Sequence, residues 1–239
     1  MPAGRPLKRI KRQAKFLLGR LPVAGARLRL PTAHYGSEYG GWEVLPGLLG
    51  SHSEVWSYGI GHDPSFDLEV IRHHGCRVRA FDPTPGLGDW ITAQGFDARF
   101  EFEPIGLAAF DGEVEMRPQS VDGDSSSTIL SQSEIPVDTH GVPVRVERLA
   151  TTAARLGVTR IDLLKMDIEG AEFEAIPDLL ASGVEIGQLL VEFHPYVSNG
   201  YPRQREAYRQ IVAAGFVLFD LSLRDMEFGF VHRSQIPGE

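Results

Sequence analysis

Short apolar runs alternate with helical segments from residue 54 to the end of the chain, and this alternation restricts the fold more than any other feature. Strands are expected at 54–58, 77–81, 97–102, 161–167, 188–193, 216–222 and 227–233, and helices at 64–75, 87–95, 151–157, 171–183 and 202–215. Strands that alternate with helices predict a doubly wound α/β domain with a mostly parallel sheet. Only a few residues separate the last two strands, so an antiparallel hairpin is expected at the edge of the sheet.

The chain divides by composition into three parts. Residues 1–30 contain nine lysines and arginines and no acidic residue, and they form a basic leader that is expected to be partly helical. Residues 31–53 are rich in glycine, proline and aromatic residues, and are interpreted as an irregular lead-in. Residues 54–239 form the α/β domain; within it 103–148 is less regular, with two strand-like runs around a polar loop at 120–134.

The charge is distributed unevenly along the chain. The net charge is −8, but beyond the leader 15 basic residues stand against 32 acidic ones. A body this acidic repels nucleic acid, so no nucleic-acid partner is expected, and a small cationic cofactor or a neutral polar substrate fits better. No apolar run approaches the ~18 residues of a membrane span. No signal-peptide core follows the basic N-terminus and the single Cys76 fits a reducing compartment, so we expect a cytoplasmic protein.

The basic leader allows two interpretations. Its apolar residues recur at roughly helical intervals, at Leu7, Ile10, Ala14, Leu17, Leu18 and Leu21. The simpler interpretation is a solvated helix that packs its apolar stripe on the domain, or a frayed tail. The alternative is a helix that lies on an anionic membrane surface, which would make the protein peripheral to a membrane.

A glycine turn follows the first strand of the domain. In "YGIGHDPSFD", Gly59 and Gly61 allow a tight turn and close backbone approach to a ligand at the start of a helix. The nicotinamide fingerprint requires a third glycine where Pro64 stands. Asp63 suits a cationic ligand better than a pyrophosphate, and Asp82, 23 residues after Gly59, has the spacing of a ribose-binding carboxylate. A positively charged nucleoside without pyrophosphate, S-adenosylmethionine, fits both observations.

Acidic residues gather where two later strands end. The stretch "LLKMDIEGAE" at 163–172 begins as a buried strand and then brings Asp167 and Glu169. Carboxylates are costly in a core, so they are expected where the strand meets solvent or a ligand. The next strand ends in "VEFHP", which contributes Glu192 and His194. Because parallel strands end at the same edge of a sheet, these side chains are expected to converge.

The segment "IDLLKMDIEGAEFEAI" at 161–176 closely resembles the signature of the FkbM-type methyltransferase family. Further segments, "YGIGHDPSFDLEVI", "AFDPTP", "PIGLAAFDGEVEM" and "LLVEFHP", follow in the family's order, so the resemblance covers roughly 36–233. It implies the class I methyltransferase (Rossmann-like) fold, with a seven-stranded sheet whose last two strands form a hairpin. It also implies S-adenosylmethionine as cofactor, and O-methylation of a hydroxyl on a sugar, glycoconjugate or natural product.

The resemblance also implies roles for individual residues. Gly59 and Gly61 would approach the methionine part of the cofactor, and Asp82 would hold the ribose. Ile105 and Gly106 would line the adenine, and Asp167 would lie near the cofactor's amino group or the acceptor. The chain departs from many methyltransferases two places before the first glycine, where Ser57 replaces an acidic residue.

Two ways of activating an acceptor hydroxyl remain open. His194 is the preferred general base because an ordinary imidazole titrates near neutrality, with Asp167 and Glu169 beside it. Alternatively Asp167, Glu192 and His194 could hold Mg²⁺ or Mn²⁺, which would lower the hydroxyl's pKa directly. Two other functions also remain: a nicotinamide-dependent oxidoreductase on the same sheet, and a non-catalytic relative that binds a partner through its leader. The sequence leaves the oligomeric state open.

Overall fold

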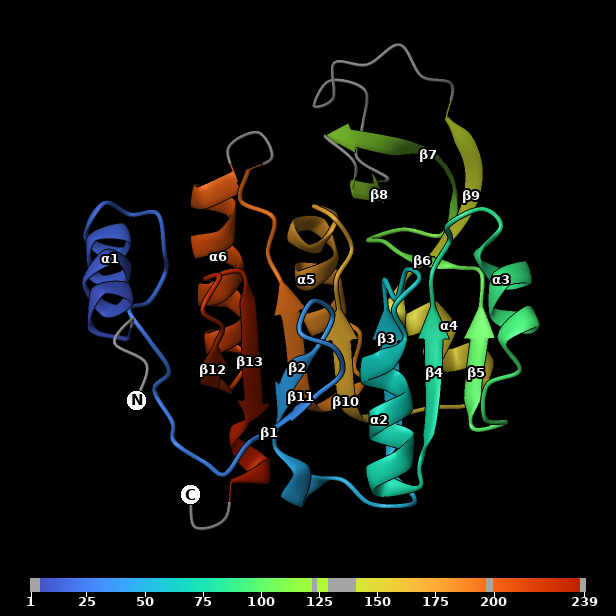
Figure 1. The fold of residues 1–239 in the computed structure, drawn as a ribbon, viewed down its shortest axis with the longest axis horizontal. Helices are drawn as coiled ribbons and strands as arrows, with labels where there is room; N and C mark the ends of the chain where they lie inside the picture. The colour runs from blue at the N-terminus through green and yellow to red at the C-terminus, as the bar shows by residue number, and fades with distance from the viewer. Residues whose placement is uncertain (1–4, 122–123, 129–140, 197–199, 237–239) are drawn as a thin grey trace.

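One large mixed sheet organises the chain in the computed structural model, which describes residues 5–121, 124–128, 141–196 and 200–236 (Figure 1). In the order of their hydrogen bonding, its strands are β12 (Phe216–Leu221), β13 (Glu227–His232), β11 (Glu185–Glu192), β10 (Arg160–Met166), β3 (Glu54–Tyr58), β4 (Arg77–Phe81) and β5 (Phe100–Glu103). The run from β11 to β5 is parallel, and β13 is antiparallel to both of its neighbours. The predicted α/β fold with a mostly parallel sheet is confirmed.

Helices cover both faces of this sheet, because its strands are apolar on both sides. On β10, Leu164 and Met166 enter one hydrophobic cluster and Leu163 enters the other, as the alternation of side chains along a strand requires. The first cluster includes residues of α4 (Leu149–Leu156), α5 (Glu172–Leu180) and α6 (Gly200–Ala213). The second includes residues of α2 (Ser65–His74) and α3 (Leu87–Gln94).

A smaller sheet stands above the carboxyl ends of β3 and β4 (Figure 1). It has the order β6-β9-β7-β8, formed by β6 (Gly106–Leu107), β9 (Val142–Glu147), β7 (Gly112–Val121) and β8 (Asp124–Thr128). The predicted polar loop at 120–134 therefore contains a strand, because β8 pairs antiparallel with β7. Residues 122–123 and 129–134 of that loop lie outside the described residues.

The lead-in contains a short hairpin that its composition did not predict. β1 (Ala33–Tyr35) pairs antiparallel with β2 (Trp42–Val44), and a short 3₁₀ helix follows at Pro46–Leu48. Tyr35, Trp42 and Val44 are buried with residues of α2 and α3. The buried Gln188 on β11 then ties the chain after the hairpin to the sheet, since its side chain accepts a hydrogen bond from the Leu45 N–H (2.8 Å) and donates one to the Leu45 carbonyl (3.2 Å).

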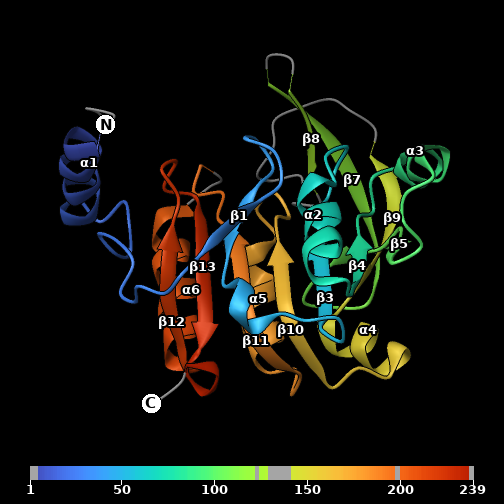
Figure 2. The same cartoon turned by 60° about the horizontal axis from the view of Figure 1, so that its bottom comes forward.

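The leader forms a helix, α1 (Arg5–Leu17), beside the edge of the sheet that carries α6 and β12 (Figure 2). Ion pairs attach it: Arg12 and Lys15 contact the Asp225 carboxylate at 2.5 and 2.6 Å. The described apolar side chains of α1 itself are exposed, with Ile10 at 66% and Leu17 at 80%, whereas Leu21 of the predicted apolar stripe, just after the helix, is buried in the core of the domain. None of the helices in the described residues has the length and apolar character that crossing a membrane requires.

Candidate active site

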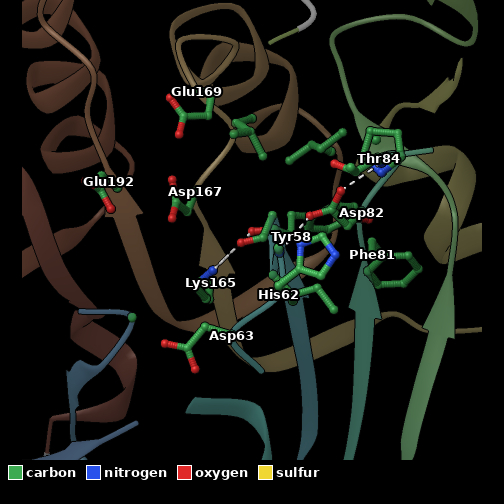
Figure 3. A pocket seen from close by; sticks show the side chains of 18 of the residues that line it. Tyr58, His62, Asp63, Phe81, Asp82, Thr84, Lys165, Asp167, Glu169 and Glu192 are labelled. Carbon is green, nitrogen blue, oxygen red and sulfur yellow. Dashed lines mark hydrogen bonds between the residues drawn. The ribbon is translucent and has the colours of Figure 1, made fainter. Parts of the chain in front are cut away.

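A cavity of about 400 Å³ lies at the carboxyl ends of β3, β4 and β10 (Figure 3), the edge where open α/β sheets bind ligands. Predicted site residues on its wall are Gly59, Gly61, Asp63, Asp82, Gly106, Asp167, Glu169 and Glu192. Ile105 and His194 are buried and are not among the lining residues, and the expected contact of Ile105 with an adenine ring stays a prediction. The small sheet, the lead-in and the β12–β13 turn supply further lining residues: Leu107, Met116, Tyr39, Gly40, Trp42 and Arg224.

The two glycines of the turn after β3 have different surroundings. Both have positive φ angles, +73° at Gly59 and +52° at Gly61, which glycine adopts without steric cost. A β-carbon on Gly59 would lie 1.6 Å from the carbonyl oxygen of Asp167. A β-carbon on Gly61 would meet no atom within 4 Å. Gly59 is therefore required by packing against the end of β10, whereas Gly61 borders open space in the cavity.

Asp82 is fixed at the end of β4 by the backbone on both of its sides. One carboxylate oxygen accepts a hydrogen bond from the Gly61 N–H and the other accepts one from the Thr84 N–H, both at 2.9 Å (Figure 3). The residue is only 5% exposed. Each oxygen retains a lone pair that a donor in the cavity could use. The geometry thus provides a fixed bidentate acceptor at this position, and the ribose-binding role expected from its spacing stays a prediction.

Asp63 is held by the lead-in and by the start of α2. Its carboxylate accepts hydrogen bonds from the Ser37 hydroxyl (2.5 Å) and the Ser65 N–H (3.2 Å). Burial opposes ionisation, but the hydrogen bonds from Ser37 and Ser65 outweigh it and bring the pKa of Asp63 below its usual value. Asp63 is therefore ionised at neutral pH, and it contributes negative charge to the cavity wall.

Lys165 lies at the base of the cavity and binds the turn after β3 directly. It is 4% exposed, and its Nζ donates a hydrogen bond to the Gly59 carbonyl oxygen at 2.7 Å (Figure 3). A lysine one residue before the end of β10 could be expected to neutralise the carboxylates that follow the strand. Within the described residues no ion pair at 4.0 Å or less joins Lys165 to any of them, so its main contact is with the backbone.

Four ionisable side chains converge where β10 and β11 end, as their neighbouring strand ends predicted. His194 Nε2 lies 3.6 Å from a carboxylate oxygen of Asp167 and 3.4 Å from one of Glu169. Asp167, Glu192 and His194 each offer one ligand atom, and these atoms all lie within 4.8 Å of one another. Burial, with Asp167 adding to it, raises the pKa of Glu192 above its usual value.

The surroundings of His194 change the expectation for its charge. Burial favours the neutral ring, but Glu172, Glu169 and Asp167 together raise the pKa of His194 to about 9. The ring is therefore an imidazolium at neutral pH, and the ordinary pKa on which its selection as general base rested does not hold in this arrangement. A role of His194 as base stays a prediction that requires the proton to be displaced first.

The comparison with protein families agrees with this geometry. A family model described as the methyltransferase FkbM domain matches residues 49–218, more than half of the chain. The chain belongs to the FkbM methyltransferase family. No curated protein and no solved structure gave a significant match. The matched region of this FkbM methyltransferase contains the glycine turn, Asp82 and both acidic strand ends, so the resemblance drawn from "KMDIEGAE" is confirmed.

Three polar residues in or behind the site were not predicted from the sequence. Glu172 begins α5, where an acidic residue is ordinarily explained by the helix dipole, but it is fully buried and accepts hydrogen bonds from the backbone N–H groups of Gly170 and His194, both at 2.7 Å. Asp67 on α2 is also buried, and burial raises its pKa to about 6 while Lys165 opposes the rise. Arg224 reaches the cavity from the β12–β13 turn, beyond the matched region. Only tertiary packing brings them there, and no local pattern marks them.

Proposed function

We propose that this protein is an S-adenosylmethionine-dependent methyltransferase that acts on a hydroxyl of a small or carbohydrate-like acceptor. The observation that carries the proposal is Asp82, a buried bidentate acceptor at the end of β4 beside a glycine turn that borders open cavity. Such a carboxylate suits the two ribose hydroxyls of a nucleoside. The match to the FkbM methyltransferase domain supports the same reading.

The charge of the cavity wall fits a cationic cofactor. Five carboxylates line it, from Asp63, Asp82, Asp167, Glu169 and Glu192, against the two cations of Lys165 and Arg224. A sulfonium with a protonated amino group is attracted to such a wall, whereas a pyrophosphate is repelled. The strand order from β12 to β5, with its antiparallel edge pair, supports the seven-stranded class I arrangement that the resemblance implies.

Each part of the wall would have its own task. S-adenosylmethionine, when bound, would supply the methyl group to the acceptor oxygen and leave as S-adenosylhomocysteine, and the acceptor hydroxyl would pass its proton to a carboxylate at the strand ends. Asp82 would orient the ribose, and the turn at Gly59–Gly61 would admit the methionine part. Asp167 and Glu169 face the region where an acceptor would lie, and they would accept hydrogen bonds from its hydroxyl.

The cofactor site is tested by isothermal titration with S-adenosylmethionine and S-adenosylhomocysteine. Asp82→Ala removes charged hydrogen bonds, and we expect affinity to fall by about tenfold to a hundredfold. Asp89→Ala removes an exposed acidic residue of the same region, on α3, and should leave affinity unchanged. Circular dichroism must establish that all three proteins are folded. A folded wild type that binds neither ligand would overturn the proposal.

A nicotinamide-dependent oxidoreductase remains the second candidate for the same sheet. The sequence has Pro64 where that class needs its third glycine, and Asp63 is held ionised beside the turn. Titration with NAD⁺ and NADP⁺ separates the two candidates, because micromolar binding of a dinucleotide without binding of S-adenosylmethionine would favour the oxidoreductase. Binding of none of these ligands would favour a non-catalytic relative.

A further inference from the structure

We propose that Asp167, Glu192 and His194 form a divalent-cation site suited to Mg²⁺ or Mn²⁺ at the edge of the cavity. The role of the cation rests on the proposed methyltransferase function, since it would act on the acceptor hydroxyl. Binding of the cation can be tested separately, because all three proposed ligands are side chains of the protein and neither cofactor nor acceptor is needed.

The topology brings the three ligands together. β10 and β11 are parallel neighbours, with Met166 opposite Val191 at the end of the pairing. Asp167 follows β10 directly, Glu192 ends β11, and His194 stands two residues further along. Their ligand atoms lie within 4.8 Å of one another. Opposite ligands of an octahedral Mg²⁺ ion are about 4.2 Å apart and adjacent ones about 3 Å, so closure needs movements on the order of 1 Å.

Glu192 supplies an independent indication that a cation belongs here. The residue is 8% exposed, its carboxylate lines the cavity, and Figure 3 draws it on the side of the cavity where Asp167 lies. No hydrogen bond within the described residues reaches this carboxylate; its only ion pair there is with Arg224, at 3.8 Å. Arg224 is itself in close contact with Glu227. A buried carboxylate without donors is costly, and a bound cation would remove that cost.

His194 is oriented as a ligand by a carboxylate behind it. Its Nδ1 lies 3.4 Å from an oxygen of Glu172, and the same oxygen accepts the His194 backbone N–H at 2.7 Å. Nε2 is thereby directed toward Asp167 and Glu169. Histidines that bind metals commonly have a carboxylate at the ring nitrogen that does not bind the metal, because it fixes the ring and its tautomer. The arrangement of Glu172 and His194 matches this pattern. A cation would bind Nε2 only by displacing the proton that the neighbouring carboxylates hold on the ring.

The set of ligand atoms determines which cations fit. Two carboxylates and one imidazole suit Mg²⁺ and Mn²⁺, which prefer oxygen ligands and leave other coordination positions for water or a substrate oxygen. A cation at this position would polarise an acceptor hydroxyl next to Asp167 and Glu169, and would lower the pKa of that hydroxyl. The acceptor could then lose its proton without His194 as base.

The test measures Mn²⁺ binding to metal-stripped protein by calorimetry and by electron paramagnetic resonance, without cofactor or acceptor. We expect wild type to bind about one Mn²⁺ and to gain thermal stability from it. Glu192→Gln keeps the size of the side chain and should weaken binding by at least about tenfold. Asp167→Asn should act in the same direction.

Asp63→Asn is the matched control, because it removes one negative charge from the wall of the same cavity without touching the three proposed ligands. The carboxylate of Asp63 is held by Ser37 and Ser65, and we expect its loss to change Mn²⁺ affinity by less than about threefold. Equal losses in Asp63→Asn and Glu192→Gln would indicate unspecific attraction to negative charge and would overturn the site. Absence of Mn²⁺ binding to folded wild type would overturn it too. Titration of metal-free protein with S-adenosylmethionine tests the proposed function by itself, so a failure of the cation site can be distinguished from a failure of cofactor binding.

Discussion

At the scale of single residues, the two glycines of the turn after β3 are needed for different reasons. Gly59 is required by packing, whereas Gly61 leaves space for a ligand. Gly59→Ala would place a β-carbon 1.6 Å from the Asp167 carbonyl, so the end of β10 would have to move. We expect this variant to lose on the order of 3 kcal/mol or more of unfolding free energy. Gly61→Ala meets no atom, and should lose only about 1–2 kcal/mol from its positive φ angle. Urea unfolding measures both, and equal losses would contradict the assignment.

The buried carboxyl of Asp67 makes stability depend on pH. Its pKa is raised from 3.8 to about 6 in the folded protein, so the folded state binds the proton more tightly than the unfolded state. Stability from this group is therefore gained as pH falls through about 6 toward 4, and the ionised form costs roughly 2–3 kcal/mol near pH 7. Asp67→Asn should stabilise the protein near pH 7 and give no gain near pH 4. Urea unfolding at both pH values tests this, and destabilisation at pH 7 would refute it.

At the scale of elements, Glu172 joins the ends of two strands. Its two oxygens accept one backbone N–H from the turn after β10 and one from the segment after β11. Glu172→Gln retains one acceptor oxygen but turns an N–H₂ group toward the other donor. We expect a loss of about 1–3 kcal/mol in unfolding free energy. The control Glu174→Gln removes a charge from the exposed side of the same helix and should change stability little. Similar losses in the two variants would contradict a joining role for Glu172.

Some helices and strands could be predicted from the sequence alone, and others could not. The strands at 54–58 and 77–81 were predicted with their observed bounds, because each is a short run rich in β-forming residues that stops at Gly59 or at Asp82. β1 and β2 have only three residues each, too few for a periodicity to be recognised, and their pairing depends on burial of Trp42 against α2 and α3. Local patterns therefore predicted the sheet, but they could not predict what packs on it.

The candidate site also has features that the sequence predicts and features that it does not. The approach of Asp167, Glu192 and His194 was predictable, since residues after neighbouring parallel strands meet at one edge of the sheet. The charge of His194 was not predictable, because it depends on Glu172, which comes from a helix and is buried behind the ring. The contact of Lys165 with the Gly59 carbonyl was also hidden, since it depends on the register of β10 with β3.

At the scale of the whole molecule, a charged contact joins the leader helix to the rim of the cavity. Arg12 and Lys15 on α1 both bind Asp225, and the residue before it, Arg224, lines the cavity. Asp225→Asn removes the charge but keeps a residue type that tolerates its φ angle of +66°. We expect α1 to detach more often, so trypsin should cleave after Lys11 and Lys15 faster. Glu206→Gln, a charge change on the exposed face of α6, should leave the cleavage rate unchanged.

Binding of the leader to a membrane surface stays a prediction, and it depends on the side of α1 that does not contact the domain. The leader, residues 1–30, contains no acidic residue, and it exposes the apolar side chains of Ile10, Phe16, Leu17 and Leu18. Such a helix should bind vesicles that contain anionic phosphatidylglycerol, since insertion of apolar side chains and attraction between opposite charges both favour binding. Raising the salt concentration should release the vesicles, because salt screens the attraction between the charges.

Vesicle co-sedimentation of the full chain measures this binding. Replacing Leu17 and Leu18 with serine should abolish it, whereas Phe110→Ser removes an exposed apolar side chain elsewhere and should preserve it. If wild type ignores anionic vesicles, or binds neutral ones equally well, the leader acts through its contact with Asp225 and not through lipid. If anionic vesicles are bound, the contact between Asp225 and α1 would hold the cavity rim next to the membrane surface, and acceptors carried by lipid would come within reach of the cavity.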